Sequence, residues 1–316
     1  MKARIVLAIL VVFLSVAWAQ IPVVHREPNP GTQELLQKAR VAIGGTLTLQ
    51  SLSVKGQVRR KVKYLEVSSP TEVTEKEKTL TSKLHMDFQF PDKFRIREKG
   101  THLNGMSYEL VAIVNDREAW LYPQPIVPST PENRRVVSVE DAEQNFRKQA
   151  QTARANISRY TLGWLLTSAS TLPLEFNYAG RITSEVGTNE VLTVRDVDGY
   201  KLLLLLDPQT HLPTMLNETV VLPQRVTVLP TGFGFDRRFN RAIFARAREE
   251  RQARSKPPQA ISVQMRLSDR RNIGGLNLPH RITTYYNGQE VEDIEFQEFI
   301  LNRPIDPKKF AENRPQ

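Results

Sequence analysis

Regular alternation of apolar and polar residues is the feature that most constrains how this chain can fold. Between Leu84 and Phe90 every second side chain is apolar, and His85, Asp87 and Gln89 stand between them. A period of two is typical of antiparallel strands with one buried and one solvated face. The same period recurs in residues 93–97, 172–178 and 261–267. These segments predict a predominantly antiparallel sheet.

Turn and helix signals divide the strands into groups. Asn287-Gly288 is a strong hairpin signal, because both residues tolerate the positive φ angles of a type I′ turn, and Asp198-Gly199 is a second candidate. We predict a helix capped by Thr32 that ends before Gly44-Gly45. We predict further helices at residues 139–168 and at residues 235–256, the second ended by Pro257-Pro258.

The predicted elements define the fold class. About ten strands with three helices indicate an α+β domain dominated by one large antiparallel sheet. A sheet of this size tends to curl, and its concave apolar side then needs a cover. The two inserted helices are the expected cover, and any space that they leave would be an apolar cavity.

The first residues predict export. Lys2 and Arg4 precede a short apolar run, and the small-residue sequence AWA follows it at residues 17–19. This arrangement is typical of a secretory signal peptide, and the run is shorter than the roughly 20 residues that a membrane-spanning helix needs. We therefore predict a cleaved signal peptide at residues 1–19 and a single domain at residues 20–316.

The sequence offers little catalytic chemistry. The chain has no cysteine, which excludes disulfides, thiolate-bound zinc and iron–sulfur clusters. Its five histidines lack metal-binding helical spacing, and no G-x-S-x-G, phosphate-binding or complete dinucleotide-binding motif occurs. We predict no enzyme, no cofactor and no metal site. An enzyme whose site residues are scattered along the chain is the least favoured alternative.

Residues 88–97, FQFPDKFRIR, resemble a segment of the periplasmic outer-membrane lipoprotein carriers, the LolA-like family. In that family a strand ends at a proline, and the next strand begins with a phenylalanine and often an arginine. Other segments similar to the family follow in the expected order: Gly44-Gly45 after the first helix, then residues 114–123 (VNDREAWLYP), 206–213 (LDPQTHLP), 275–279 (GLNLP) and 302–310 (NRPIDPKKF).

The resemblance implies a fold, a compartment and a function. The carriers form an incomplete β-barrel of about ten to eleven strands, lidded by helices, whose apolar interior holds acyl chains. They work in the periplasm in outer-membrane biogenesis, between an inner-membrane exporter and an outer-membrane acceptor. Two differences stand out: Phe90 replaces the arginine that precedes the proline in the best-known carriers, and this chain is longer at residues 60–80 and 230–258. Lipoprotein, free lipid, glycolipid and a protein client all remain open as cargo.

The apolar side chains of the alternating strands are the candidate binding residues. Phe94 matches the phenylalanine after the proline that matters for transfer in the carriers. The alternative is that the set packs a solid core, because alternation is first of all a burial signal. The residues that we predict to line a lipid-binding cavity are Leu84, Met86, Phe88, Phe90, Phe94, Ile96, Trp120, Tyr122, Phe176, Met265 and Leu267.

A basic helix is the candidate surface site. The net charge of +10 suggests acidic partners, and residues 235–256 hold eight basic residues against three acidic ones. Its alternative interpretation is a solvated insertion. The residues that we predict to contact an anionic membrane surface are Arg237, Arg238, Arg241 and Arg248.

The sequence thus favours a non-enzymatic exported carrier or binder of lipid or lipoprotein acyl chains that acts between membranes. Its predicted partners are those acyl chains, envelope membrane proteins and an anionic membrane surface, but not nucleic acid. The alternative is an envelope protein-interaction module with a solid core and a basic helix that docks on a membrane or a partner.

Overall fold

The structure is a computed structural model. It describes residues 30–45, 49–116, 118–122, 139–167, 173–184, 187–196, 201–224, 226–231 and 236–312. The predicted signal peptide and the Asp198-Gly199 turn lie outside these residues.

Three α-helices, a short 3-10 helix and thirteen strands make up the described part of the chain. The helices are α1 (Pro30–Ile43), α2 (Val139–Leu165), α3 (Arg237–Arg254) and η2 (Pro307–Ala311). The strands are β1 (Ser51–Val67), β2 (Val73–Gln89), β3 (Lys93–Thr101), β4 (Ser107–Asn115), β5 (Glu118–Tyr122), β6 (Leu174–Ser184), β7 (Gly187–Asp196), β8 (Lys201–Leu206), β9 (Pro213–Gln224), β10 (Thr227–Pro230), β11 (Lys256–Ile273), β12 (Leu276–Tyr286) and β13 (Gln289–Leu301).

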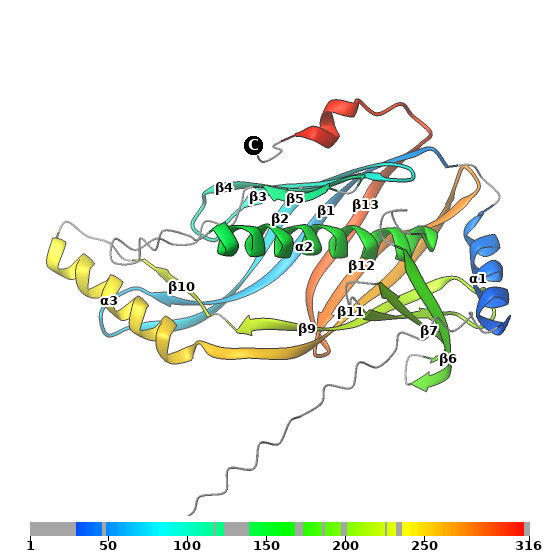
Figure 1. Cartoon of the computed structure of the whole chain (residues 1–316). Helices are drawn as coiled ribbons and strands as arrows, with labels where there is room; N and C mark the ends of the chain where they lie inside the picture. Colours follow the sequence, from blue (N-terminus) through cyan, green and yellow to red (C-terminus); the bar gives the residue numbers. More distant parts are fainter. Residues whose placement is uncertain are drawn as a thin grey trace, which may run out of the picture.

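One sheet contains all the described strands, in the order β5-β4-β3-β2-β1-β13-β12-β11-β9-β8-β7-β6 (Figure 1). These neighbours are all antiparallel, and β10 pairs in parallel with the outer end of β1. The predicted α+β class and single antiparallel sheet are confirmed. The prediction of a curled, incomplete barrel is wrong, because the sheet is open between its edge strands β5 and β6 and is not strongly curled.

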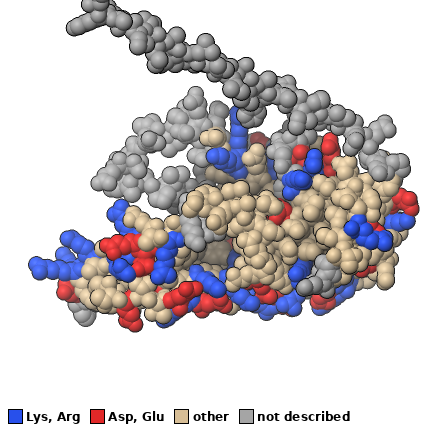
Figure 2. Space-filling view, turned by 90° about the horizontal axis from the view of Figure 1, so that it is seen from below, with Lys and Arg blue, Asp and Glu red and all other residues tan. Residues whose placement is uncertain are grey.

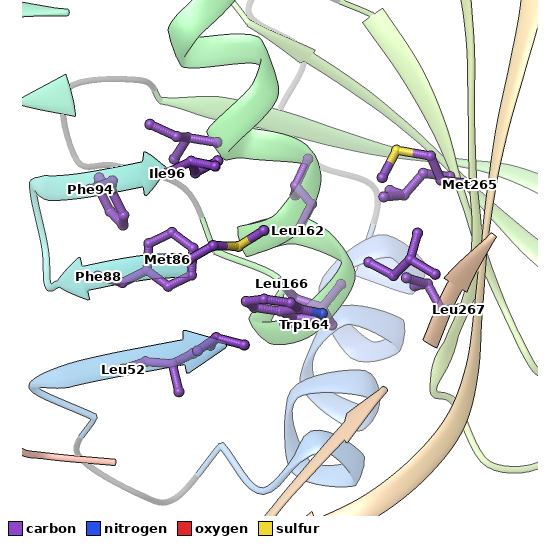
Figure 3. Packing of buried hydrophobic residues seen from close by; sticks show 14 of the residues in the cluster. Leu52, Met86, Phe88, Phe94, Ile96, Leu162, Trp164, Leu166, Met265 and Leu267 are labelled. Atoms are coloured by element: carbon purple, nitrogen blue, oxygen red, sulfur yellow. The ribbon is translucent and has the colours of Figure 1, made fainter. Parts of the chain in front are cut away.

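Helix α2 explains why the sheet can stay open. It crosses one face of the sheet (Figure 1), and its buried side chains join the main hydrophobic core. The ring centroid of Trp164 lies 4.9 Å from that of Phe296 and 5.8 Å from that of Phe88. Figure 3 shows Leu162 and Trp164 between the residues of β1 to β3 and those of β11. The helix buries the apolar face, so the strands need not close on themselves.

The predicted helices and turns are found with shifted ends. Thr32 does not cap α1, which begins at Pro30; it is buried, and its Oγ1 accepts a hydrogen bond from the backbone N–H of Tyr178 at 2.9 Å. Asp236 caps α3 by accepting a hydrogen bond from the backbone N–H of Arg238.

Strand β11 passes through Pro257-Pro258, where we predicted only a helix end. The Asn287-Gly288 hairpin is confirmed, with φ angles of 47° and 82°.

Residues 60–80 and 230–258, where this chain is longer than the best-known carriers, lie next to each other in the structure. Residues 60–80 are the outer halves of β1 and β2, and residues 230–258 include α3. A second hydrophobic cluster joins them through β10, and its buried members are Leu65, Val67, Val228, Ile243 and Ala247. Both segments therefore build one arm at the end of the molecule (Figure 1).

The C-terminal residues cover part of the opposite sheet face. Arg95 is buried on β3 and pairs with Glu312 at 2.5 Å, and Trp120 Nε1 donates to the Glu312 carbonyl at 3.0 Å. Lys309 reaches the buried carboxylate of Asp87 at 3.2 Å. Burial opposes ionisation of Asp87, but His85, Ser53 and Lys309 outweigh it and hold the pKa of this carboxyl below its usual range.

Among the described helices, none combines the length and apolar character that spanning a membrane requires.

Replacing Trp164 by alanine should lower the free energy of unfolding by about 3–5 kcal/mol, because it empties a buried aromatic site. Urea denaturation measures this loss. Trp164→Phe should cost less, since it keeps a ring and removes an indole N–H that has no hydrogen-bond partner among the described residues. A loss below about 1 kcal/mol for the alanine variant would contradict the central role of this side chain.

Candidate apolar pocket

An apolar pocket of about 350 Å³ lies where α1, α2 and the β2–β3 turn meet. Its size is at the lower end of the range for small-molecule sites, roughly 300–1,000 Å³. Most of its walls are aliphatic or aromatic, and Arg40 is the charged residue among them. The lining residues are Arg40, Ile43, Gly45, Leu49, Phe90, Pro91, Leu165, Thr167 and Leu276.

The end of α1 forms one wall because glycine stops this helix against the sheet. Gly44 has a φ of 104°, and a Cβ on it would lie 2.1 Å from the carbonyl oxygen of Gly275. Only glycine permits both this backbone conformation and this close approach. The helix therefore ends at the β11–β12 turn, with Ile43 buried and Arg40 exposed beside the pocket.

The opposite wall is the turn between β2 and β3. The backbone N–H of Phe90 donates to Gln50 at 2.9 Å, and the Phe90–Pro91 peptide bond is cis. The Phe90 ring lies edge-on to Phe94, with 5.7 Å between centroids, and 6.5 Å from Phe88. Phe90 is half-buried and therefore joins the pocket to the packed aromatic core.

The end of α2 closes the third side. The helix stops at Leu165, and Leu166 follows with a φ of 51° and is buried in the main core. Leu165 and Thr167 reach the pocket, whereas Trp164 is fully buried next to them. The pocket thus lies where α2 ends and no longer covers the sheet.

The structure places the predicted cavity residues in three different environments. Phe90 is the member that lines this pocket. Trp120 lies on the other sheet face in a separate cluster with Val111 and Ile113, and Tyr122 is 43% exposed. The others belong to the main core beneath α2 or pack against it: Leu84, Met86, Phe88, Phe94, Ile96, Phe176, Met265 and Leu267.

Several pocket residues were not predicted, because they are not on alternating strands. Ile43 and Leu165 are at the ends of helices, and Leu49 and Leu276 are at or near the starts of strands. Ile43 is the last residue of α1, and Leu165 is the last residue of α2. The usable signal was that both helices end in leucine or isoleucine next to a glycine or a break in the helix.

Arg40 supplies a positive charge at the rim. It lies in the last turn of α1, where a cation complements the negative end of the helix dipole. It is exposed and forms no ion pair with the residues that the structure describes. An anionic group held at the mouth of the pocket could therefore pair with it.

A layer of buried charge marks the other limit of the apolar face. Glu98 accepts hydrogen bonds from Arg60, Ser82 and Tyr108, and Arg60 also donates to Glu292 at 2.6 Å. Burial opposes ionisation of Glu98, but these partners outweigh it and lower its pKa. Each of these groups has a hydrogen-bond partner within the protein, so we interpret the layer as stabilising the fold rather than binding a ligand.

The predicted surface arginines all lie on α3. Arg237, Arg238, Arg241 and Arg248 are exposed, whereas Ile243 and Ala247 face the sheet. Figure 2 shows Lys and Arg gathered at the end of the molecule where α3 lies, with Asp and Glu among them.

The described residues contain no group of three His, Cys, Asp or Glu side chains placed to hold a metal ion.

Comparison with known proteins gives structural but not sequence similarity. No family model and no curated protein matches the sequence. A LolA superfamily protein from Nitrosomonas europaea matches with 13% identity and a TM-score of 0.43, covering 88% of this chain and 96% of its own. A domain described as an outer membrane lipoprotein-sorting protein domain, from Vibrio parahaemolyticus, matches with 11% identity and a TM-score of 0.43. The match covers 90% of this chain and 97% of the Vibrio chain.

A DUF1329 family protein from Desulfovibrio piger is also similar, with 10% identity and a TM-score of 0.39, covering 88% of this chain and 96% of its own. The first two matches are similarities in overall structure to proteins described by the family that residues 88–97 resemble.

The buried charge layer predicts how stability depends on pH. Because the pKa of Glu98 is lowered in the folded state, its stabilisation is complete above the unfolded-state pKa of about 4.3 and is lost as the pH falls. Glu98→Gln should cost about 2 kcal/mol at pH 7 and reduce the loss of stability between about pH 5 and pH 3. Urea denaturation of both proteins across this range checks it, and parallel pH profiles would contradict it.

Proposed function

We propose that this protein is a non-enzymatic carrier or binder of acyl chains, from lipid or lipoprotein, that acts between the membranes of the cell envelope. The observation that carries the proposal is the apolar pocket of about 350 Å³ between α1, α2 and the β2–β3 turn. We also propose export through cleavage after Ala19 and a periplasmic location, for which the support is the sequence at residues 1–19.

Hydrophobic transfer is sufficient for such a role. Each buried methylene contributes roughly 0.8 kcal/mol, so a segment of about eight methylenes gives roughly 6 kcal/mol before the entropy of binding is subtracted. The aliphatic lining fits a chain of this kind, and Arg40 fits an anionic head group at the mouth. The binding would be reversible, as transfer between membranes requires.

The larger predicted cavity requires a movement of α2. In the structure, Trp164 and its neighbours occupy the space over Met86, Phe88 and Met265. We propose that the acyl chain enters at Phe90 and reaches these residues only where the end of α2 moves away. The pocket is the part of the site that needs no such movement.

The alternative function is an envelope protein-interaction module. The observation that favours it is that α2 fills the apolar face with a packed core. The two functions differ in one property: a carrier purified without detergent retains or takes up an amphiphile, whereas a module does not.

Phe90→Asp should abolish binding of a long-chain fatty acid, because it places a charge in the wall of the pocket. Native mass spectrometry of detergent-free protein with added fatty acid measures the bound fraction, and circular dichroism checks folding. The control is Met106→Asp, which introduces the same charge between β3 and β4 at a side chain that is 64% exposed and lies outside both proposed lipid sites. Equal binding by both variants, or no binding by the unaltered protein, would favour the interaction module.

We further propose that α3 contacts anionic lipid. Arg237, Arg241 and Arg248 form no ion pairs with described residues, whereas Arg246 and Arg254 are held by Glu250. Phe244 is exposed on the same helix, and arginine with exposed aromatic residues is typical of helices that lie at a membrane surface. Each basic residue near such a surface contributes about 1 kcal/mol.

The triple variant Arg237→Gln, Arg241→Gln, Arg248→Gln should weaken binding to phosphatidylglycerol vesicles by about a hundredfold at low salt, because three such contacts are lost. Vesicle co-sedimentation measures it. Phosphatidylcholine vesicles are the control and should bind neither protein. Undiminished binding of the triple variant to phosphatidylglycerol would dismiss this role of α3.

A further inference from the structure

A second hollow, of about 490 Å³, lies on the sheet face opposite α2. Side chains alternate between the two faces of a strand, so the neighbours of buried Leu84 and Met86 on β2 point to this side. Four adjacent strands, β13, β1, β2 and β3, supply the walls. The lining residues are Lys55, Gly56, Gln57, Lys83, Leu84, His85, Arg97, Lys99 and Gln297, and we call this hollow the basic groove.

The strand register brings basic side chains together in the basic groove. Lys83 on β2 stands directly opposite Lys99 on β3, and His85 stands opposite Arg97. Lys55 on β1 is in turn opposite His85. Like charges in directly opposed positions destabilise an antiparallel pair. The repulsion between Lys83 and Lys99 therefore lowers the stability of the sheet at this place.

The acidic residues around the basic groove do not neutralise it. Arg97 and Lys99 share the one carboxylate of Glu109, and Lys55 pairs with Glu298 at 2.6 Å. Lys83 is exposed and forms no ion pair with a described residue.

The nearby Asp87 does not compensate either. It contacts His85 at 3.3 Å, but it also holds Lys309 at 3.2 Å and Arg95 at 3.4 Å. The basic groove thus keeps an excess of positive charge that an anionic ligand would balance.

We propose that the basic groove binds an extended acidic peptide segment of a partner protein. Side chains on one face of an extended chain recur about every 6.6–6.8 Å, which is the spacing of Lys83 from His85 and of Arg97 from Lys99 along their strands. Carboxylates at alternate positions of a peptide parallel to β2 and β3 therefore match both rows. The concave shape admits a single chain more readily than a flat bilayer.

This site is independent of the acyl-chain pocket, because the two are on opposite faces of the sheet. Exposed ion pairs are individually weak and are screened by salt. Binding should therefore be modest, fast and strongly dependent on ionic strength.

The test uses the full chain and a short fluorescein-labelled peptide of alternating Glu and Thr, with fluorescence anisotropy at low and high salt. The double variant Lys83→Gln, Lys99→Gln should bind the peptide about five- to tenfold more weakly at low salt, and its melting temperature should be unchanged or raised because the opposed charges are gone. A Gln–Thr peptide of equal length should not bind the unaltered protein.

The matched control is Lys61→Gln, Lys63→Gln, which removes the same charge from the same face of β1 outside the basic groove. It should bind the acidic peptide as the unaltered protein does. Equal loss in both double variants, or no binding by the unaltered protein, would overturn the proposal. So would binding to phosphatidylglycerol vesicles that is lost specifically in Lys83→Gln, Lys99→Gln, because the groove would then be a membrane contact.

Discussion

The packing of α2 on the sheet is the interaction on which the rest of the structure depends. A sheet of thirteen strands has an apolar face too large to leave in contact with water. Two buried small residues, Ala150 and Ala153, let the middle of the helix approach the sheet, and Trp164 fills the deeper space near the helix end. Because α2 buries this face together with the buried side chains of α1, the strands need not close into a barrel. The place where the helix ends then decides where an apolar opening can remain.

Local patterns predicted the sheet, because alternation and turn chemistry act within a few residues. The β2 and β3 pattern and the Asn287-Gly288 hairpin needed no knowledge of distant contacts. The same reasoning failed for Trp120. Residues 111–114 are apolar on both faces, so alternation cannot tell which face is which, and the register places Trp120 opposite Ile113 rather than Val114. Its partner, the C-terminal Glu312, is far away in the sequence.

The sequence predicted an apolar cavity, and the pocket in the structure shares only Phe90 with the residues that we predicted to line it. Phe90 was recognised because its strand alternates, whereas Ile43, Leu165 and Leu276 meet it only through tertiary packing. The extent to which Trp164 occupies the apolar face depends on where α2 lies, and no local pattern fixes that. Thr32 is a similar case, since its hydroxyl binds the distant Tyr178 backbone instead of its own helix. Sequence patterns thus specify which face is buried, and packing decides what fills it.

The two charged regions of the sheet differ in a way that separates structure from binding. On the inner face, the carboxylate of Glu98 is buried and has Arg60, Ser82 and Tyr108 as partners, so its charge is consumed within the fold. On the outer face, exposed Lys83 and Lys99 stand opposite each other on β2 and β3; Lys99 shares Glu109 with Arg97, and Lys83 forms no ion pair with a described residue. An acidic residue at one of these positions would form a favourable opposite-charge pair. With lysine at both positions, the positive charge of Lys83 stays available to the acidic peptide that we propose as its ligand.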